Sequence, residues 1–181
     1  AAADLAAGFC YLNNAAIAAA CLTAGGRRTA ILDIDVHHGN GTQAIFYDRS
    51  DVLTVSIHAD PRRFYPFFWG YAEERGRGPG EGFNLNLPLA RGTDLRAYCA
   101  ALDVALARLA DFAPDVLVLA AGLDIAIDDP FRGFAIATPD FTEIGRRIAG
   151  LGLPLLIVQE GGYPSPNLGA NLEALLQGLL S

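Results

Sequence analysis

The sequence has 181 residues, of which 52% are hydrophobic and 18% charged, and its formal net charge at pH 7 is −7. This composition excludes a disordered chain and argues against a nucleic-acid-binding protein that relies on a basic surface. The three cysteines form no CxxC pair and the apolar runs are only of strand length, so we expect a single domain in the reducing cytoplasm, without disulfides or a membrane span.

Apolar runs and helix-like periodicities divide the chain into predicted elements. In chain order these are a helix at about 11–24, strands at 28–35, 51–58 and 83–89, a helix at 93–112, a strand at 115–122, a helix at 138–151, a strand at 153–160 and a helix at 165–180. Thr93 and Thr138 are the predicted N-caps of two helices, with Pro139 at the first helical position. Several strands are continuously apolar, which favours burial on both faces. The alternation predicts an α/β fold with a mainly parallel sheet and flanking helices.

Polar residues directly follow four of the predicted strands, at 33–40, 58–60, 124–129 and 160–163. Because the carboxyl ends of parallel strands lie at one edge of a sheet, where α/β proteins bind ligands, we expect these residues at a common rim. The glycine-rich segment 70–82 is interpreted as a surface loop near that rim, either a lid or a plain connection.

The segment ILDIDVHHGNGT, at 31–42, suits a metal site. Asp35 and His37 are two residues apart, so in an extended chain their side chains lie on the same side. Carboxylate oxygen and imidazole nitrogen are zinc ligands, and Asp124 at a strand end is the best-placed third ligand. Oxygen-rich ligation also suits iron, manganese or cobalt. The alternative is a buried carboxylate that backbone amides satisfy beside a core histidine.

Other polar and aromatic residues leave two interpretations open. Asp33 is either an acceptor that orients a histidine or a ligand for a monovalent cation, and His38 is interpreted as a hydrogen-bonded interior histidine. Tyr163, in QEGGY, either donates a hydrogen bond to a developing oxyanion or is an ordinary half-buried tyrosine. The aromatic runs at 62–71 and 8–14 predict either a narrow apolar channel for an extended substrate or a small secondary core.

Taken together, these residues resemble the histone deacetylase superfamily, and within it the bacterial acetylpolyamine amidohydrolases. The matching segments cover practically the whole chain in the family's order: GFCYLNNAAIAA, ILDIDVHHGNGTQAIFY, DVLTVSIHADP, FYPFFWGYAEERG, GLDIAIDDP and QEGGY. The resemblance implies an arginase-like α/β fold of which this chain holds the later strands. Residues 1–181 would then be one deacetylase-like domain that lacks its amino-terminal part.

The resemblance also implies a set of site residues. A catalytic zinc ion, or Fe²⁺ in its place, would lie on Asp35, His37 and Asp124. Tyr163 would stabilise the oxyanion while metal-bound water attacks the N-acetyl group. Substrate-binding residues would be Phe9, Tyr65 and Gly161. One K⁺ would lie on Asp33, Asp35, His37, Ser56 and Ile57, and a second on backbone carbonyls of Phe46, Arg49, Val52 and Phe83.

One departure from the family's pattern bears on activity. The family's two adjacent histidines, a general base and its electrostatic partner, precede the segment that corresponds to AAADLAAGF, and neither is present in these residues. We therefore expect the chain to be part of a longer protein, and to show weak zinc binding and little turnover as it stands. The intact protein is expected to hydrolyse the N-acetyl amide of an acetylpolyamine or acetyl-lysine-like amine.

Two other functions remain open. One is a pseudoenzyme that binds a metal and an acylated amine without hydrolysis. The other is a magnesium or manganese site at Asp33-x-Asp35 for a nucleotide-sugar or phosphate substrate, although the sequence has no glycine-rich phosphate loop and no clustered basic cradle. The expected partners are a small acetylated amine and, in a homodimer, a second copy, with no nucleic acid and no membrane.

Overall fold

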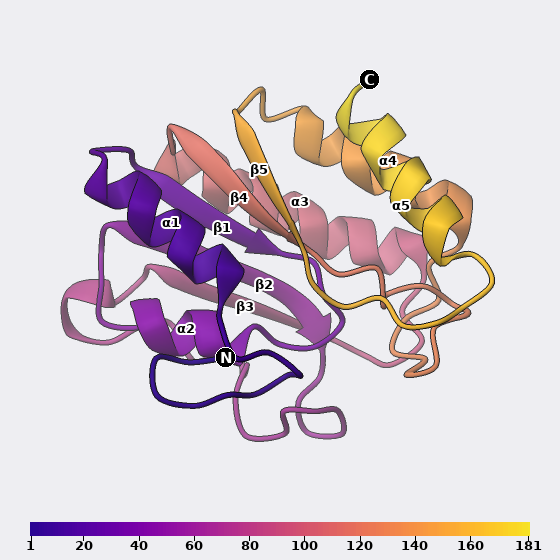
Figure 1. The fold of residues 1–181 in the computed structure, drawn as a ribbon, viewed down its shortest axis with the longest axis horizontal. Helices are drawn as coiled ribbons and strands as arrows, with labels where there is room; N and C mark the ends of the chain where they lie inside the picture. The colour runs from indigo at the N-terminus through magenta and orange to yellow at the C-terminus, as the bar shows by residue number, and fades with distance from the viewer.

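A computed structural model describes all 181 residues of the chain. Five strands form one sheet in the order β3-β2-β1-β4-β5, and every pairing is parallel (Figure 1). The strands are β1 (Thr29–Asp33), β2 (Val52–Ala59), β3 (Asn84–Leu89), β4 (Val116–Ala121) and β5 (Leu155–Gln159). The predicted α/β fold with a mainly parallel sheet is confirmed.

Helices cover both faces of this sheet (Figure 1). One face carries α1 (Asn14–Ala24) and α2 (Asn40–Phe46), and the other carries α3 (Leu95–Phe112), α4 (Thr138–Ala149) and α5 (Leu168–Leu179). A short 3-10 helix, η1 (Gly78–Gly80), lies in the loop before β3. None of these helices is both long enough and apolar enough to cross a membrane.

Alternate residues of the central strands pack into two different hydrophobic cores. Leu32 of β1 packs into the larger core with α3, α4 and α5, whereas Ile31 packs into the smaller core beneath α1. All residues of β1, β2 and β4 are buried. The apolar runs of β1 and β4 predicted this, whereas β2 also buries the polar side chains of Thr54, Ser56 and His58. The prediction fails for β5, where Leu156 and Ile157 are 37% and 39% exposed. β5 has a neighbouring strand on one side only.

The two predicted N-caps were wrong by one residue each. The cap of α3 is Asp94, which accepts a hydrogen bond from Ala97 N–H, whereas the Thr93 hydroxyl donates to the Ala90 carbonyl. The cap of α4 is Ala137, and Thr138 lies within the helix, where its hydroxyl donates to Asn171 of α5. In both cases a contact outside the helix takes up the threonine hydroxyl.

Two other element predictions differ from the structure. α1 begins at Asn14, after the N-cap Asn13, so that residues 11–13 are not helical. The segment 70–82 is a plain connection, because none of its residues lines the cavity described below. Part of it runs to the amino-terminal end of β2, where Arg77 N–H donates to the Tyr47 carbonyl.

Candidate metal centre

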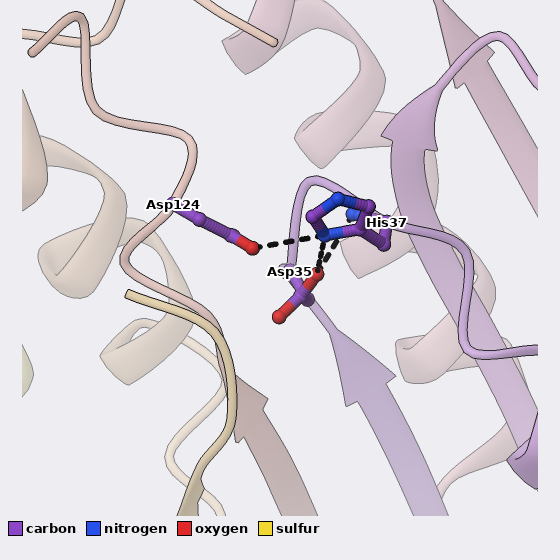
Figure 2. A group of neighbouring side chains, drawn as sticks. All are labelled: Asp35, His37 and Asp124. Carbon is purple, nitrogen blue, oxygen red and sulfur yellow. Dashed lines mark hydrogen bonds and ion pairs between the residues drawn. The ribbon is translucent and has the colours of Figure 1, made fainter. Parts of the chain in front are cut away.

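Three predicted ligands lie together at the carboxyl edge of the sheet. Asp35 and His37 follow β1, and Asp124 follows the adjacent strand β4. One donor atom from each residue lies within 4.8 Å of the other two. Nδ1 of His37 is 3.1 Å from Oδ1 of Asp35 and 3.0 Å from Oδ2 of Asp124 (Figure 2). This donor set, with two carboxylates and one imidazole, suits a divalent cation with a coordination position left open.

Backbone N–H groups orient both carboxylates. Val36 N–H donates to Oδ1 of Asp124 at 2.9 Å, which leaves Oδ2 turned toward His37. The N–H groups of His37 and Gly161 donate to the two oxygens of Asp35, each at 2.7 Å. Hydrogen bonds of this kind fix ligand geometry around metal ions in proteins.

The electrostatics of the three residues also fit a cation. Burial and the nearby charge of Asp35 raise the pKa of Asp124 to about 7. Burial also disfavours charge on His37, but hydrogen bonds to Asp124 and Asp35 outweigh it and raise the His37 pKa to about 10. Burial disfavours ionised Asp35 as well, yet its hydrogen bonds and the His37 charge lower its pKa. Two buried carboxylates thus compete for one cationic partner, and a divalent ion would relieve their repulsion.

Glycine at position 161 keeps the space between the ligands open. A Cβ atom at Gly161 would overlap the carboxylates of both Asp124 and Asp35. A Cβ atom at Gly122 would likewise overlap the backbone of Asp35. The QEGGY loop and the end of β4 therefore approach the candidate metal site more closely than any residue with a side chain allows.

A cavity of about 750 Å³ opens beside Asp35, His37 and Gly161. Its walls include Asp35 and His37 together with the aromatic side chains of Phe64 and Tyr163. The Tyr163 ring lies 6.4 Å from the His37 ring, centroid to centroid. Burial, followed by the charges of Asp35 and Asp124, raises the Tyr163 pKa to about 12, so its phenol is a hydrogen-bond donor at neutral pH.

Comparison with known proteins gives the family. A model of the histone deacetylase domain matches residues 1–179. Acetylpolyamine amidohydrolase 1 of Pseudomonas aeruginosa is 54% identical over 176 residues, which are 97% of this chain and 51% of that protein. The chain belongs to the histone deacetylase family.

Solved structures share the deacetylase fold. The crystal structure of acetylpolyamine aminohydrolase from Burkholderia pseudomallei superposes with a TM-score of 0.95 at 51% identity, covering 98% of this chain and 52% of that one. A histone deacetylase homologue from Aquifex aeolicus gives a TM-score of 0.92 at 33% identity, covering 100% and 49%. The chain therefore spans about half the length of the relatives that it matches.

The predicted substrate-binding residues also lie around the cavity. Phe9, Tyr65 and Gly161 all line it, and Phe9 is 87% exposed at its mouth. The Phe9 ring contacts the Tyr163 ring edge-on, at 6.2 Å between centroids. Their role in substrate binding stays a prediction.

The residues predicted to bind K⁺ form two groups in the structure. Asp33 and Ser56 are paired in register on β1 and β2, close to the candidate metal ligands, with Ile57 following Ser56 on β2. The other group, Phe46, Arg49, Val52 and Phe83, lies around the amino-terminal end of β2. Carbonyls of that group already accept hydrogen bonds, Phe46 from Arg49 and Phe83 from Thr54.

Sequence reasoning missed two residues at or beside the candidate site, Phe131 and Asp129. The Phe131 ring lies 5.1 Å from the His37 ring and 4.6 Å from the Tyr163 ring. Asp129 is 2% exposed and accepts hydrogen bonds from the backbone of Phe131 and Tyr163. The polar run after β4 indicated that this loop reaches the rim of the sheet. Only the path of the loop in the structure shows that Phe131 lines the cavity.

The other two histidines are engaged in hydrogen bonds inside the protein. His38 bonds Gln43, and His58 bonds both Ser56 and the Gly70 carbonyl. Burial lowers the His58 pKa to about 4, and burial together with the His58 charge lowers that of His38 to about 3. The interpretation of His38 as an interior histidine agrees with this arrangement, and neither residue is suited to act as a base near neutral pH.

Proposed function

We propose that the protein is a zinc-dependent deacetylase that hydrolyses the N-acetyl amide of an acetylpolyamine or of a related small amine. The observation that supports this most is the convergence of Asp35, His37 and Asp124, whose donor atoms lie within 4.8 Å of one another, with Asp35 and His37 lining a cavity. Relatives named acetylpolyamine amidohydrolase, at 50–54% identity, support this substrate class. Fe²⁺ would fit the same donors.

Each residue has a distinct role in this proposal. A zinc ion held by the three ligands would supply Lewis-acid polarisation and an activated water. Tyr163 donates its phenol hydrogen bond to the carbonyl oxygen of the substrate as negative charge develops there. Phe9, Tyr65 and Phe131 form aromatic walls, which exclude water from the acyl group and its alkyl chain.

The 181 residues contain no free histidine to act as general base, because His37 is a proposed ligand and the other two are buried. We therefore propose that turnover needs residues from outside this segment, and that the segment alone is close to inactive. A binding protein without hydrolysis is the competing function, and it would show no acetate release even from the intact protein.

We further propose K⁺ at the two predicted groups. Burial and the charge of Asp35 raise the Asp33 pKa well above its ordinary value, and no Arg, Lys or His nitrogen forms an ion pair with Asp33. A cation beside this carboxylate would favour its charged form. Stability measured in K⁺ and in a larger organic cation at equal ionic strength tests this, and equal stability in both would contradict it.

The experiment for the main proposal uses the intact protein, with zinc content and acetate release both measured. We expect one zinc per chain and release of acetate from N-acetylputrescine or an acetyl-lysine peptide. Asp124→Asn should lose zinc, and Tyr163→Phe should keep zinc but lower kcat about 10²–10³-fold. Bound zinc without acetate release from any acetylated amine would favour the competing function.

A further inference from the structure

Tyr163 occupies a weakly anchored stretch of backbone. Gly161, two residues before it, is fixed on both sides, since its N–H donates to Asp35 and its carbonyl accepts from Leu123 N–H. Gly162 then has a φ of +135°, a region that residues with side chains rarely adopt. Pro164 follows Tyr163 and has no N–H to donate. Neighbouring backbone bonds therefore do not fix the direction of the Tyr163 side chain.

Asp129 supplies the missing anchor from the loop after β4. Its Oδ2 accepts the Tyr163 N–H at 3.1 Å and its Oδ1 accepts the Phe131 N–H at 2.9 Å. The rings of these two residues contact each other edge-on, with 4.6 Å between centroids. One carboxylate thus fixes the backbone of both members of an aromatic pair that faces the candidate metal site.

The chemistry of Asp129 points to a specific task. The residue is 2% exposed and forms no ion pair, so its charge is compensated by hydrogen bonds. A carboxylate has acceptors on both oxygens, whereas an asparagine amide has one acceptor and one donor group. Asp129 offers one oxygen to each of the two N–H donors, whereas asparagine would turn its NH₂ group toward one of them, and bonds to a charged acceptor are the stronger kind.

We propose that Asp129 is a positioning residue, which holds the Tyr163 backbone so that the phenol points at the reacting carbonyl. This inference rests on the proposed function of Tyr163. Asp129 does not line the cavity and forms no hydrogen bond or ion pair with the metal ligands, so it acts through the backbone that it anchors and not by contact with the reacting groups.

The test compares Asp129→Asn with Asp128→Asn in the intact protein. The control makes the same change one residue away, where an asparagine oxygen still accepts the hydrogen bond that Asn167 donates. We expect Asp129→Asn to lower kcat about 10–100-fold, with KM and zinc content within about twofold of wild type. Asp128→Asn should leave all three unchanged.

A double-mutant cycle with Tyr163→Phe separates positioning from general destabilisation. If Asp129 acts through the phenol, adding Asp129→Asn to Tyr163→Phe should change kcat less than about twofold. Multiplying effects, or an Asp129→Asn protein as active as wild type, would overturn the proposal. Rates are compared per folded, zinc-bound protein.

Two further measurements test the anchoring by Asp129 even if Asp129→Asn folds poorly or the proposed function is wrong. Replacing the Tyr163 amide by an ester deletes the donor without changing Asp129, and it should lower kcat as Asp129→Asn does. Hydrogen exchange at the Tyr163 amide should accelerate in Asp129→Asn and not in Asp128→Asn. If Tyr163→Phe leaves turnover intact, the proposed function fails, while unchanged exchange would independently overturn the anchoring by Asp129.

Discussion

The Cα of Gly161 faces the space in which the carboxylates of Asp35 and Asp124 meet. Its φ lies outside the left-handed region, so alanine would tolerate the backbone conformation, and only the methyl group would conflict with the ligands. Gly161→Ala should therefore lower zinc affinity about 10–100-fold while the fold is retained. Competition with a chromophoric chelator measures this affinity.

Gly169→Ala is the matched control for that change, since a Cβ atom at Gly169 meets no atom within 4 Å. Gly169 lies in α5, where alanine is the more favourable helix residue. Wild-type zinc affinity in Gly161→Ala would show that the three candidate ligands do not converge on the ion.

Individual residues of the site differed in how far the sequence could predict them. Asp35 and His37 share a strand exit and a spacing of two, and Asp124 ends a neighbouring apolar run, so a simple sheet rule brought them together. Phe131 and Asp129 lie in an irregular loop without periodicity. Their positions depend on tertiary hydrogen bonds, which no local pattern encodes.

Among the elements, α2 shows where local pattern and tertiary structure disagree. Its first residues, Asn40 and Gly41, are a typical turn pair. Its N-cap is Gly39, which has no side chain to cap the helix. The helix is held instead by burial of Phe46 in the smaller core and by Gln43, which bonds Asn84 and Asn86 of β3. A helix of seven residues is fixed by such contacts more than by its propensity.

The loops after β3 and β4 are joined by Arg91. Its guanidinium donates to the carbonyls of Phe131 at 2.9 Å and Arg132 at 3.0 Å. Arg91→Ala should loosen this contact, and amide hydrogen exchange in 122–137 should accelerate roughly fivefold. Arg96→Ala, on the exposed side of α3, is the control and should leave exchange unchanged. Equal exchange in both variants would show that the aromatic wall does not depend on Arg91.

The buried histidine of β2 gives a prediction for acid stability. His58 accepts from the Ser56 hydroxyl and donates to the Gly70 carbonyl, an arrangement that requires the neutral ring. Burial lowers its pKa from 6.5 to about 4 in the folded protein. The unfolded chain therefore takes up a proton first, so this contribution to stability is complete above about pH 6.5 and declines as the pH falls to about 4.

Urea unfolding of wild type and His58→Gln across this pH range measures the contribution. The variant should be less stable at pH 7, and its stability should decline less with acid, by up to about 1.4 kcal/mol per pH unit. Groups common to both proteins cancel in the difference. Parallel pH profiles would show that His58 carries its proton in the folded state.

The order of the strands in the sheet explains which strand predictions succeeded. A continuous apolar run indicates burial on both faces, and β1 and β4 in the middle of the sheet satisfy it. The run LLIVQ in β5 has the same composition but lies at an edge, and strand order cannot be read from the run itself. The predicted homodimer and the single domain stay predictions.

The exposed edge of β5 leads us to expect self-association when the 181 residues are produced alone. An apolar edge strand offers unpaired backbone groups and side chains to a second copy, and natural edges are usually protected by charge. Leu156 and Ile157 carry no such protection. We expect concentration-dependent self-association in sedimentation experiments, which Leu156→Lys with Ile157→Lys should suppress. Leu180→Lys, which replaces an 87% exposed leucine beyond α5, should not. Equal association of all three proteins would place the contact elsewhere than at β5.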